Sequence, residues 1–212
     1  MTLQIRRENP EDYSAVEALT RDAFWDVHVP GCDEHYLAHI LREAECFIPE
    51  LDLVAIYEGT LVGNIMYSKA LLKLDSGGAL ELLCFGPLSV APAFQRKGIG
   101  KALVEKSLEL AGGMGYGAVI IYGDPDYYRR LGFRPGEDYG IRGQEGMYSP
   151  ALQVLELVPG ALKGLHGSFF EDQIYQLDPE AAARFEQGFP PREKGFRPSQ
   201  LRFQEMLAQA HY

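Results

Sequence analysis

The sequence predicts an α/β protein, in the broad sense that includes α+β folds, and two observations lead to this prediction. Apolar segments with the alternation and β-branched content of strands are interleaved with segments that open on helix caps. The 212 residues are 46% hydrophobic and 24% charged, which is the composition of an ordinary globular protein with a sizeable core. A chain of this length is expected to hold one main domain.

The first half of the chain is expected to contain four strands and two helices. Asn9 and Pro10 are residue types that suit a helix cap and a first helical position, and Asp33 caps a second helix. Glu58-Gly59 is a tight-turn sequence between two apolar runs. The expected elements are a strand at 3–8, helices at 9–25 and 33–45, a strand–turn–strand over 51–74, and a long buried strand at 79–92.

The second half begins with a helix from Gly98 and ends with a change of composition at Asp178. Asp124 and Pro125 again suit a cap and a first helical turn. From Asp178 onward, two helical pieces surround a proline-rich turn, so we expect a domain over 1–177 and a C-terminal helical appendage over 178–212 that packs on it. The other expected elements are a strand at 117–123, a short helix at 124–133, and strands at 152–160 and 167–177.

Charge and cysteine content argue against several classes of function. Twenty Lys and Arg residues against thirty Asp and Glu residues give a net charge of −10, which disfavours binding to nucleic acid or to an anionic membrane. The N-terminal residues lack the apolar stretch of a signal peptide, and the longest nearly uncharged run, 82–94, is shorter than the about 20 residues of a membrane span. Cys32, Cys46 and Cys84 form no C-x-x-C pair. We expect a cytoplasmic protein.

Residues 95–101, with the sequence QRKGIGK, combine two glycines with three basic residues at the expected start of a helix. Free N–H groups at a helix start carry partial positive charge, and glycine lets an anion approach the backbone closely. This junction is therefore predicted to bind an anion, and a pyrophosphate is the natural occupant. The Walker A pattern fails, because Gln95 and Ala102 stand where Gly and Ser or Thr are needed. The dinucleotide fingerprint fails at Leu103.

Gly86 and Pro87 interrupt the long strand at 79–92. Proline cannot donate to a strand ladder, and a neighbouring glycine favours a β-bulge. A bulge here is predicted to splay this strand from its neighbour and to open a slot that exposes backbone groups.

Two motifs resemble the GNAT N-acetyltransferase superfamily. The first is Q-x-x-G-x-G at Gln95, Gly98 and Gly100, entered from the strand end LSVAP, and the second is YYRRLGF at 127–133. The chain looks most like an uncharacterised bacterial subgroup, and the resemblance covers residues 3–158. It implies a mixed, mostly antiparallel sheet with helices on both faces, splayed between its fourth and fifth strands by acetyl-CoA.

The resemblance also implies the donor and the residues that bind it. The family moves an acetyl group from acetyl-CoA to a primary amine, here by direct attack in a ternary complex. The fourth strand would pair with the pantetheine arm, and the glycine loop would hold the pyrophosphate. The implied acetyl-CoA contacts are Leu88, Ser89, Val90, Gln95, Arg96, Lys97, Gly98, Ile99, Gly100 and Lys101.

Catalytic residues follow less directly from the resemblance. The tyrosine of the second motif maps to Tyr128, which would be the general acid for the departing thiolate. Glu81 is a candidate general base, although it lies three residues from Cys84, where some family members carry a glutamate, and so points to the opposite pleat face. Asp124, Asp126 and a water chain are alternatives. A covalent route through Cys84 is a further variant.

The segment that joins the first two helices lines the acceptor pocket in the family, which makes Phe24, Trp25, His28 and Tyr36 candidate acceptor contacts. His28, Cys32, His35 and His39 could also be read as a metal cluster, but no further group of ligands accompanies them, so no metal is expected. The expected partner is a small-molecule or peptide amine. A homodimer remains open, and the alternative function is a non-catalytic acetyl-CoA sensor or interaction module.

Overall fold

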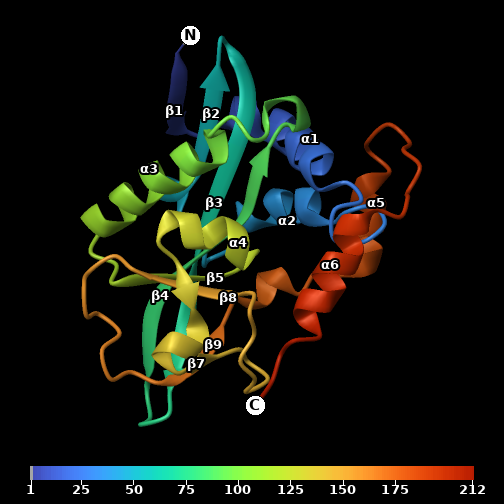
Figure 1. The fold of residues 1–212 in the computed structure, drawn as a ribbon. Coiled ribbons are helices and arrows are strands. Elements are labelled where there is room, and N and C mark those ends of the chain that lie inside the picture. Colours follow the sequence, from blue (N-terminus) through green and yellow to red (C-terminus); the bar gives the residue numbers. More distant parts are fainter. Residues whose placement is uncertain (1) are drawn as a thin grey trace.

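The computed structural model describes residues 2–212 and forms one sheet with helices on both faces (Figure 1). The strands are β1 Leu3–Arg7, β2 Leu53–Tyr57, β3 Thr60–Leu74, β4 Ala79–Val90, β5 Ala118–Tyr122, β6 Arg134–Pro135, β7 Ile141–Arg142, β8 Leu152–Glu156 and β9 Gly167–Phe170. The α-helices are α1 Tyr13–Phe24, α2 Glu34–Leu41, α3 Ile99–Gly113, α4 Pro125–Tyr128, α5 Pro179–Glu186 and α6 Pro198–Leu207. Short 3-10 helices are η1 Pro10–Asp12, η2 Pro49–Leu51, η3 Pro92–Phe94, η4 Arg129–Leu131, η5 Gly136–Tyr139 and η6 Gln173–Tyr175.

The sheet is mixed and mostly antiparallel, so the predicted fold class is confirmed. Its strand order is β1-β2-β3-β4-β5-β8-β6, and the one parallel pair along this path is β4 with β5. The expected strand at 167–177 is shorter than predicted, because β9 ends at Phe170 and η6 follows. The two-residue strands β6 and β7 were not predicted.

Strand β3 is long enough to serve two partners along one edge. Its first half pairs with β2, and its last four residues pair with β9, with Leu71 opposite Phe170. The C-terminal part of the domain is thereby returned to the middle of the sheet, beside β3 and on the side of β3 away from β4.

The bulge predicted at Gly86-Pro87 is present in β4. Ile65 of β3 lies opposite Leu88, but Tyr67 lies opposite Phe85, so β4 contains one residue more than β3 in this stretch. The extra residue reverses the alternation of side chains beyond it. Phe85 packs on the α3 side with Tyr67, whereas Ser89, four residues on, bonds to Thr20 of α1 on the other side.

Strands β4 and β5 separate directly after one pair. Among residues 2–212, their pairing is confined to Leu83 opposite Val119, although β4 continues for seven further residues to Val90. The edge of β4 from Cys84 to Val90 therefore has no strand beside it on the β5 side. The predicted splay between the fourth and fifth strands is confirmed.

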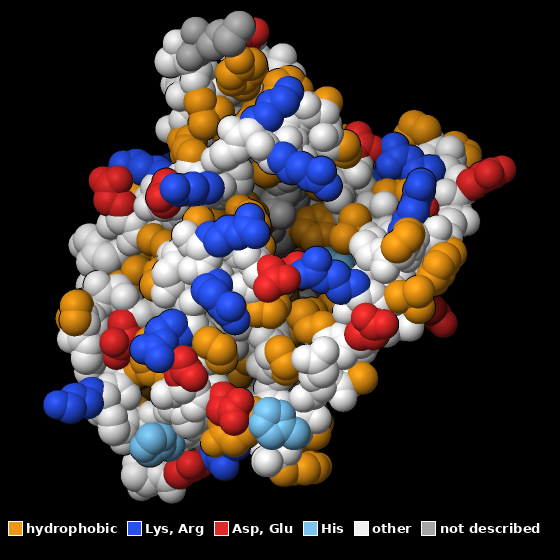
Figure 2. Space-filling view, in the orientation of Figure 1, with side chains coloured by type: hydrophobic (Ala, Val, Ile, Leu, Met, Phe, Trp, Pro, Cys, Tyr) orange, Lys and Arg blue, Asp and Glu red, His pale blue; other side chains and the backbone are white. Residues whose placement is uncertain are grey.

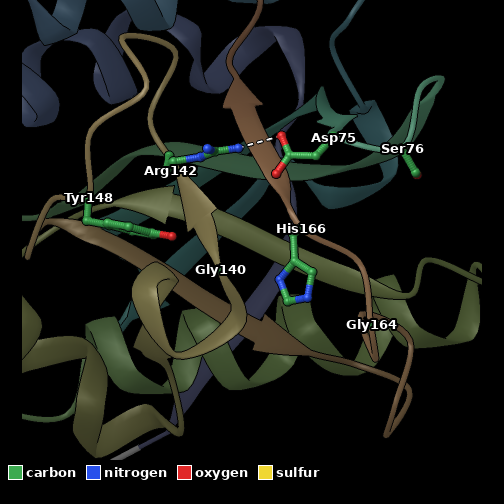
Figure 3. A pocket seen from close by; sticks show the side chains of 7 residues that line it. All are labelled: Asp75, Ser76, Gly140, Arg142, Tyr148, Gly164 and His166. Carbon is green, nitrogen blue, oxygen red and sulfur yellow. Dashed lines mark hydrogen bonds and ion pairs between the residues drawn. The ribbon is translucent and has the colours of Figure 1, made fainter. Parts of the chain in front are cut away.

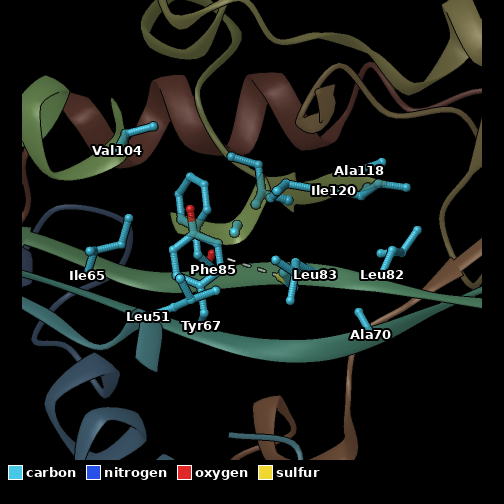
Figure 4. Close-up of a cluster of buried hydrophobic side chains, with 14 of the residues drawn as sticks. Leu51, Ile65, Tyr67, Ala70, Leu82, Leu83, Phe85, Val104, Ala118 and Ile120 are labelled. Atoms are coloured by element: carbon cyan, nitrogen blue, oxygen red, sulfur yellow. Dashed lines mark hydrogen bonds between the residues drawn. The ribbon is translucent and has the colours of Figure 1, made fainter. Parts of the chain in front are cut away.

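The core between the sheet and α3 holds the upper part of β4 in place (Figure 4). Phe85 packs against Tyr67 with ring centroids 5.1 Å apart, and the Tyr67 hydroxyl bonds to Ser107 of α3 at 2.8 Å. Tyr67 and Ser107 are both fully buried, and the hydrogen bond between them satisfies two polar groups that water cannot reach. This packing fixes the direction in which β4 leaves β5.

A second buried polar group ties β1, β2 and β3 to α2. The Arg42 guanidinium bonds to both oxygens of Glu8, and both side chains are almost completely buried. Asp52 accepts a hydrogen bond from Asn64 at 2.9 Å. Burial raises the pKa of Asp52 to about 9, and the neighbouring Glu8 carboxylate adds to this effect. Asp52 is therefore protonated at neutral pH.

The residues after Asp178 lie against α1, α2 and the loop that joins them (Figure 1). Arg21 of α1 is 4% exposed and bonds to both carboxylate oxygens of Glu186 in α5, and His35 of α2 lies 3.0 Å from the same carboxylate. In the loop, Asp26 accepts hydrogen bonds from the N–H groups of Gly31 and Gly195. A buried arginine with a paired carboxylate anchors α5, because removing one partner leaves an uncompensated charge.

We predict that Asp52→Asn removes a pH dependence of stability. Burial raises the pKa of Asp52 in the folded protein, whereas an unfolded aspartate releases its proton near pH 4, so the wild-type free energy of unfolding falls as pH rises above about 4. Asparagine imitates the protonated acid and is expected to abolish this slope. Urea unfolding at mildly acidic, neutral and mildly alkaline pH measures it.

The exposed Asp33 offers the matched control, because Asp33→Asn makes the same chemical change outside the buried group. A wild-type slope that persists unchanged in Asp52→Asn would show that Asp52 is ionised in the folded protein.

Candidate functional site

The loop between β4 and α3 has the conformation that the glycine motif predicts. Arg96 and Gly98 both have positive φ angles, of 60° and 85°, and Gly98 is the N-cap of α3. The Gln95 side-chain amide donates to the carbonyl oxygen of Val90 at 3.1 Å and so ties the loop to the end of β4. The alternation of left-handed residues turns successive N–H groups toward one side of the loop.

Six consecutive backbone N–H groups, from residue 96 to 101, have no hydrogen-bond acceptor among the described residues. The first N–H group with a partner is that of Ala102, which donates to the Gly98 carbonyl. The loop is exposed, and the Lys97 ammonium lies over the Phe94 ring while Lys101 forms a long contact with Glu105. Free N–H groups, a helix start and three cationic side chains together have the chemistry to bind an anion.

The end of β4 continues this site with an unpaired strand edge. Leu88, Ser89 and Val90 pair with Ile65, Asn64 and Gly63 of β3 on one side only. On the β5 side, their outward N–H and C=O groups have no strand to bond to. An extended ligand could add itself here as a strand, with an anionic end at the α3 loop.

Two adjacent tyrosines of α4 face this edge differently. Tyr128 packs between Phe85 of β4 and Phe133, at 5.8 and 5.4 Å between ring centroids, and its ring lies directly against Gly123. Tyr127 is 38% exposed, and its hydroxyl reaches the first turn of α3 at Gly100. Burial raises the pKa of Tyr128 above its usual range, so the phenol is neutral at physiological pH.

A hollow opens in the face of the molecule between the α3–α4 part and the α5–α6 part (Figure 2). Hydrophobic side chains lie at its floor, and Lys and Arg side chains surround it. Arg202 of α6 bonds to Asp124 and Asp126 at the start of α4, at 2.9 and 2.8 Å. The C-terminal helix thereby reaches across to the helix that carries Tyr128.

The structure brings two of the four predicted acceptor contacts together. Phe24 and His28 are neighbours, and His28 stacks on Phe203 of α6 with centroids 4.7 Å apart. Trp25 instead donates to the Glu193 carbonyl in the appendage, and Tyr36 packs against Phe185 of α5. Trp25 and Tyr36 therefore hold the appendage in place.

The carboxylates considered for the general base are each paired with a cationic side chain. Glu81 is near the start of β4, half exposed, and its partner is Lys69 at 3.4 Å. It precedes Leu88 by seven residues, which is roughly 23 Å along a strand. Asp124 caps α4 by accepting from the Asp126 N–H group, and both are paired with Arg202.

Cys84 and Glu171 form a pair that the sequence did not indicate. The Cys84 thiol donates to the Glu171 carboxylate at 3.5 Å, and Cys84 is the first residue of β4 beyond the last pair with β5. Burial raises the pKa of both the thiol and the carboxyl group. The two residues are far apart in the sequence, and the available signal was a carboxylate directly after the apolar strand GSFF.

A separate cavity of about 510 Å³ lies at the other end of the sheet (Figure 3). Its lining includes Asp75 and Ser76, which precede β4, and Arg142, which forms an ion pair with Asp75. Figure 3 shows Arg142 directed toward Asp75, with Tyr148 and His166 below this pair in the view. Because the twelve residues of β4 separate this cavity from the α3 loop, it does not belong to the site above.

Within the described residues, those that could hold a metal are not grouped as ligands. In the part of the chain that the structure describes, no three His, Cys, Asp or Glu residues are grouped as metal ligands, and Cys32, His28 and His39 contact His35, Glu34 and Glu17 respectively. No helix within residues 2–212 is both long and apolar enough to cross a membrane.

Comparison with known proteins identifies the family. Residues 45–135 match the family model described as an acetyltransferase (GNAT) domain. The chain is 32% identical over 164 residues to the uncharacterized N-acetyltransferase YhbS of Escherichia coli K12, covering 77% of this chain and 92% of YhbS. It is 37% identical over 95 residues to the uncharacterized N-acetyltransferase YjhQ of the same strain, covering 45% and 52%. The chain belongs to the GNAT N-acetyltransferase family.

Two solved structures agree with this assignment. The YhbS crystal structure from Escherichia coli in complex with CoA superposes with a TM-score of 0.72 at 28% identity, covering 82% of this chain and 92% of YhbS. A GNAT acetyltransferase from Brucella melitensis in complex with acetyl-CoA has a TM-score of 0.66 at 28% identity, covering 82% and 98%. The resemblance inferred from the two sequence motifs is confirmed.

The positive φ angle at the α3 cap yields a stability prediction. Gly98→Ala is expected to lower the free energy of unfolding by about 1 kcal/mol, because a left-handed conformation disfavours a Cβ even though no atom lies within 4 Å of it. Gly112→Ala, inside α3 and equally open, is expected to raise stability by about 0.5–1 kcal/mol. Chemical unfolding of both variants measures the difference, and equal effects would contradict the loop geometry.

Proposed function

We propose that this protein transfers an acetyl group from acetyl-CoA to a primary amine by direct attack in a ternary complex. One observation carries the proposal: six unpaired N–H groups at the α3 start continue directly into an unpaired edge of β4. A diphosphate joined to an extended, amide-containing arm has the chemistry to occupy both parts. Acetyl-CoA is such a molecule, and two solved relatives hold CoA or acetyl-CoA.

The donor would be held mainly by backbone groups. The pyrophosphate accepts from the N–H groups of Arg96 to Lys101, and the cationic side chains of this loop supply charge that the acidic chain otherwise lacks. The pantetheine amides pair with Leu88 to Val90 as an added strand. Gln95 acts indirectly, because its side chain bonds to Val90 and keeps the loop and the strand in register.

The chemistry requires a neutral amine and an acid for the leaving group. The amine nitrogen attacks the thioester carbonyl carbon, the carbon–sulfur bond breaks, and the thiolate takes up a proton. Tyr128 is the group we assign as the acid: it packs against Phe85 beside the slot, and its raised pKa keeps the hydroxyl protonated. A β4 N–H group near Val90 would polarise the thioester carbonyl.

Direct attack is favoured over a covalent route through Cys84. The Cys84 side chain is 1% exposed, and burial raises the pKa of its thiol well above the usual value. A thiol must lose its proton to act as a nucleophile, so this environment disfavours an acetylated cysteine. All three cysteines are buried and unpaired, which supports a reducing cytoplasmic location.

The acceptor would enter from the hollow beside α6. Phe24, His28 and Phe203 form an aromatic group at the junction of the α1–α2 loop with the appendage. We assign Phe24 and His28 to the acceptor side and give Trp25 and Tyr36 a structural role, since both contact the appendage. The proposed acceptor is a primary amine.

Thermal unfolding with different cofactors tests the donor. Acetyl-CoA and CoA at 100 times their Kd should each stabilise a two-state domain by about 2.7 kcal/mol, whereas ATP and NAD at the same concentration should not. A folded, cofactor-free protein that none of them stabilises contradicts the proposal. Stabilisation without thiol release from any amine in a broad panel would favour a non-catalytic sensor.

Substitution of the two tyrosines of α4 tests the acid. Tyr128→Phe is expected to lower kcat by about 10²-fold while the Kd for acetyl-CoA stays within a factor of about three, because the ring packing is kept and one proton donor is lost. Tyr127→Phe is the matched control and should change kcat little. Single-turnover kinetics and acetyl-CoA titration measure both. Unchanged turnover of Tyr128→Phe, with chemistry rate-limiting, would remove Tyr128 from the mechanism.

A further inference from the structure

Glu171 reaches the slot from the C-terminal part of the domain. It directly follows β9, whose last residue, Phe170, pairs with Leu71 of β3. Its carboxylate reaches across β3 and accepts a hydrogen bond from the Cys84 thiol at 3.5 Å. Cys84 is one residue beyond Leu83, where β4 and β5 are last paired. A carboxylate therefore lies at the point where the two strands begin to separate.

This carboxylate has no cationic partner. Among residues 2–212, the half-buried Glu171 forms no ion pair, and the hydrogen bond that its side chain accepts comes from a thiol, which is a weak donor. Two other shielded carboxylates of the chain are paired with arginine: Glu8 with Arg42 and Glu186 with Arg21. An unpaired charge in such a place is unfavourable until a cation binds to it.

Three groups that interact with Glu171 are neutral at physiological pH. Cys84 faces it from β4, Tyr122 from β5 and Tyr175 from η6. Burial raises the pKa of Tyr122 to about 12, with a contribution from the Glu171 charge, and raises the pKa values of Cys84 and Tyr175 as well. Asp172 faces Cys46 and caps η6 instead. A carboxylate with aromatic side chains beside it is a suitable environment for an ammonium group.

The segment that carries Glu171 is also tied to the bulge. The Tyr175 hydroxyl donates to the Gly86 carbonyl at 3.3 Å and bonds to Ser68 at 2.9 Å. Tyr128 contacts β4 through Phe85, whereas Glu171 contacts it through Cys84. Adjacent residues of a strand point to opposite faces, so Tyr128 and Glu171 approach the slot from its two sides.

We propose that the Glu171 carboxylate binds the ammonium group of the acceptor and takes one of its protons before attack. This inference rests on the proposed acetyl transfer. The ammonium gives one proton to Glu171, and the amine nitrogen forms the bond to the thioester carbon. The carbon–sulfur bond then breaks. The second nitrogen proton passes by way of the Tyr128 hydroxyl to the thiolate, and Glu171 releases its proton to solvent.

The first arm of the test measures amine binding with CoA present. Benzylamine and spermidine are titrated calorimetrically into the wild type, into Glu171→Gln and into Glu180→Gln. Glu180 is 88% exposed on α5, so its variant makes the same change of charge away from the slot. We expect Glu171→Gln to weaken amine binding at least tenfold and Glu180→Gln to leave it unchanged. Equal binding by all three proteins, or no amine binding by the wild type, overturns the proposal.

The second arm measures acetyl transfer to the same amines as a function of pH. Glu171→Gln should lower kcat/KM by about 10²-fold at neutral pH and regain rate as rising pH deprotonates the free amine. The wild type should lose activity as pH falls through a carboxyl pKa that burial raises, and Glu171→Asp should recover part of the rate. An unchanged pH profile in Glu171→Gln overturns the proposal.

Acetyl-CoA affinity separates this inference from the proposed function. Glu171→Gln should keep wild-type stabilisation by acetyl-CoA, which also shows that the variant is folded. If acetyl-CoA does not stabilise the wild type, the proposed donor itself is contradicted. If acetyl-CoA does stabilise it, but Glu171→Gln changes neither amine binding nor acetyl transfer, the role of Glu171 alone is contradicted.

Discussion

The early separation of β4 from β5 is the constraint on which the rest of the site depends. A parallel pair that ends at Leu83 and Val119 leaves the rest of β4 without a strand on its β5 side. Such an edge inside a sheet is normally filled by another strand, because unpaired N–H and C=O groups away from water are unfavourable. The bulge at Gly86-Pro87 adds one residue to β4 and so brings the residues beyond it into a new orientation.

Charge is distributed so that an acidic chain can hold an anion. The net charge of −10 opposes anion binding in general, yet the α3 loop has free N–H groups and three basic side chains in one place. The local field at a helix start is set by groups within one turn, and distant carboxylates are screened within about 10 Å at ordinary salt. The same acidic character suits a cationic acceptor on the other side of the slot.

The C-terminal appendage takes part in shaping the site. Its α5 is anchored by the buried Arg21–Glu186 pair, and its α6 reaches α4 through Arg202. Phe203 then stacks on His28, so α6 also contacts the loop between α1 and α2. The hollow beside α4 is therefore bordered by residues that come from the first helices and from the last one.

Sequence by itself determined the local features: the helix start near Gly98, the bulge at Pro87, the two motifs and the order of most elements. These depend on backbone preferences of glycine and proline and on periodicity, which neighbouring residues express directly. The tertiary structure decided which carboxylate stands at the slot. Glu81 is near Cys84 in the sequence but is directed to solvent, whereas Glu171 lies beside Cys84 because β3 is long enough to pair with β9 as well as β2. Contacts between residues so far apart follow from strand pairing, and a single sequence holds no local signal for them.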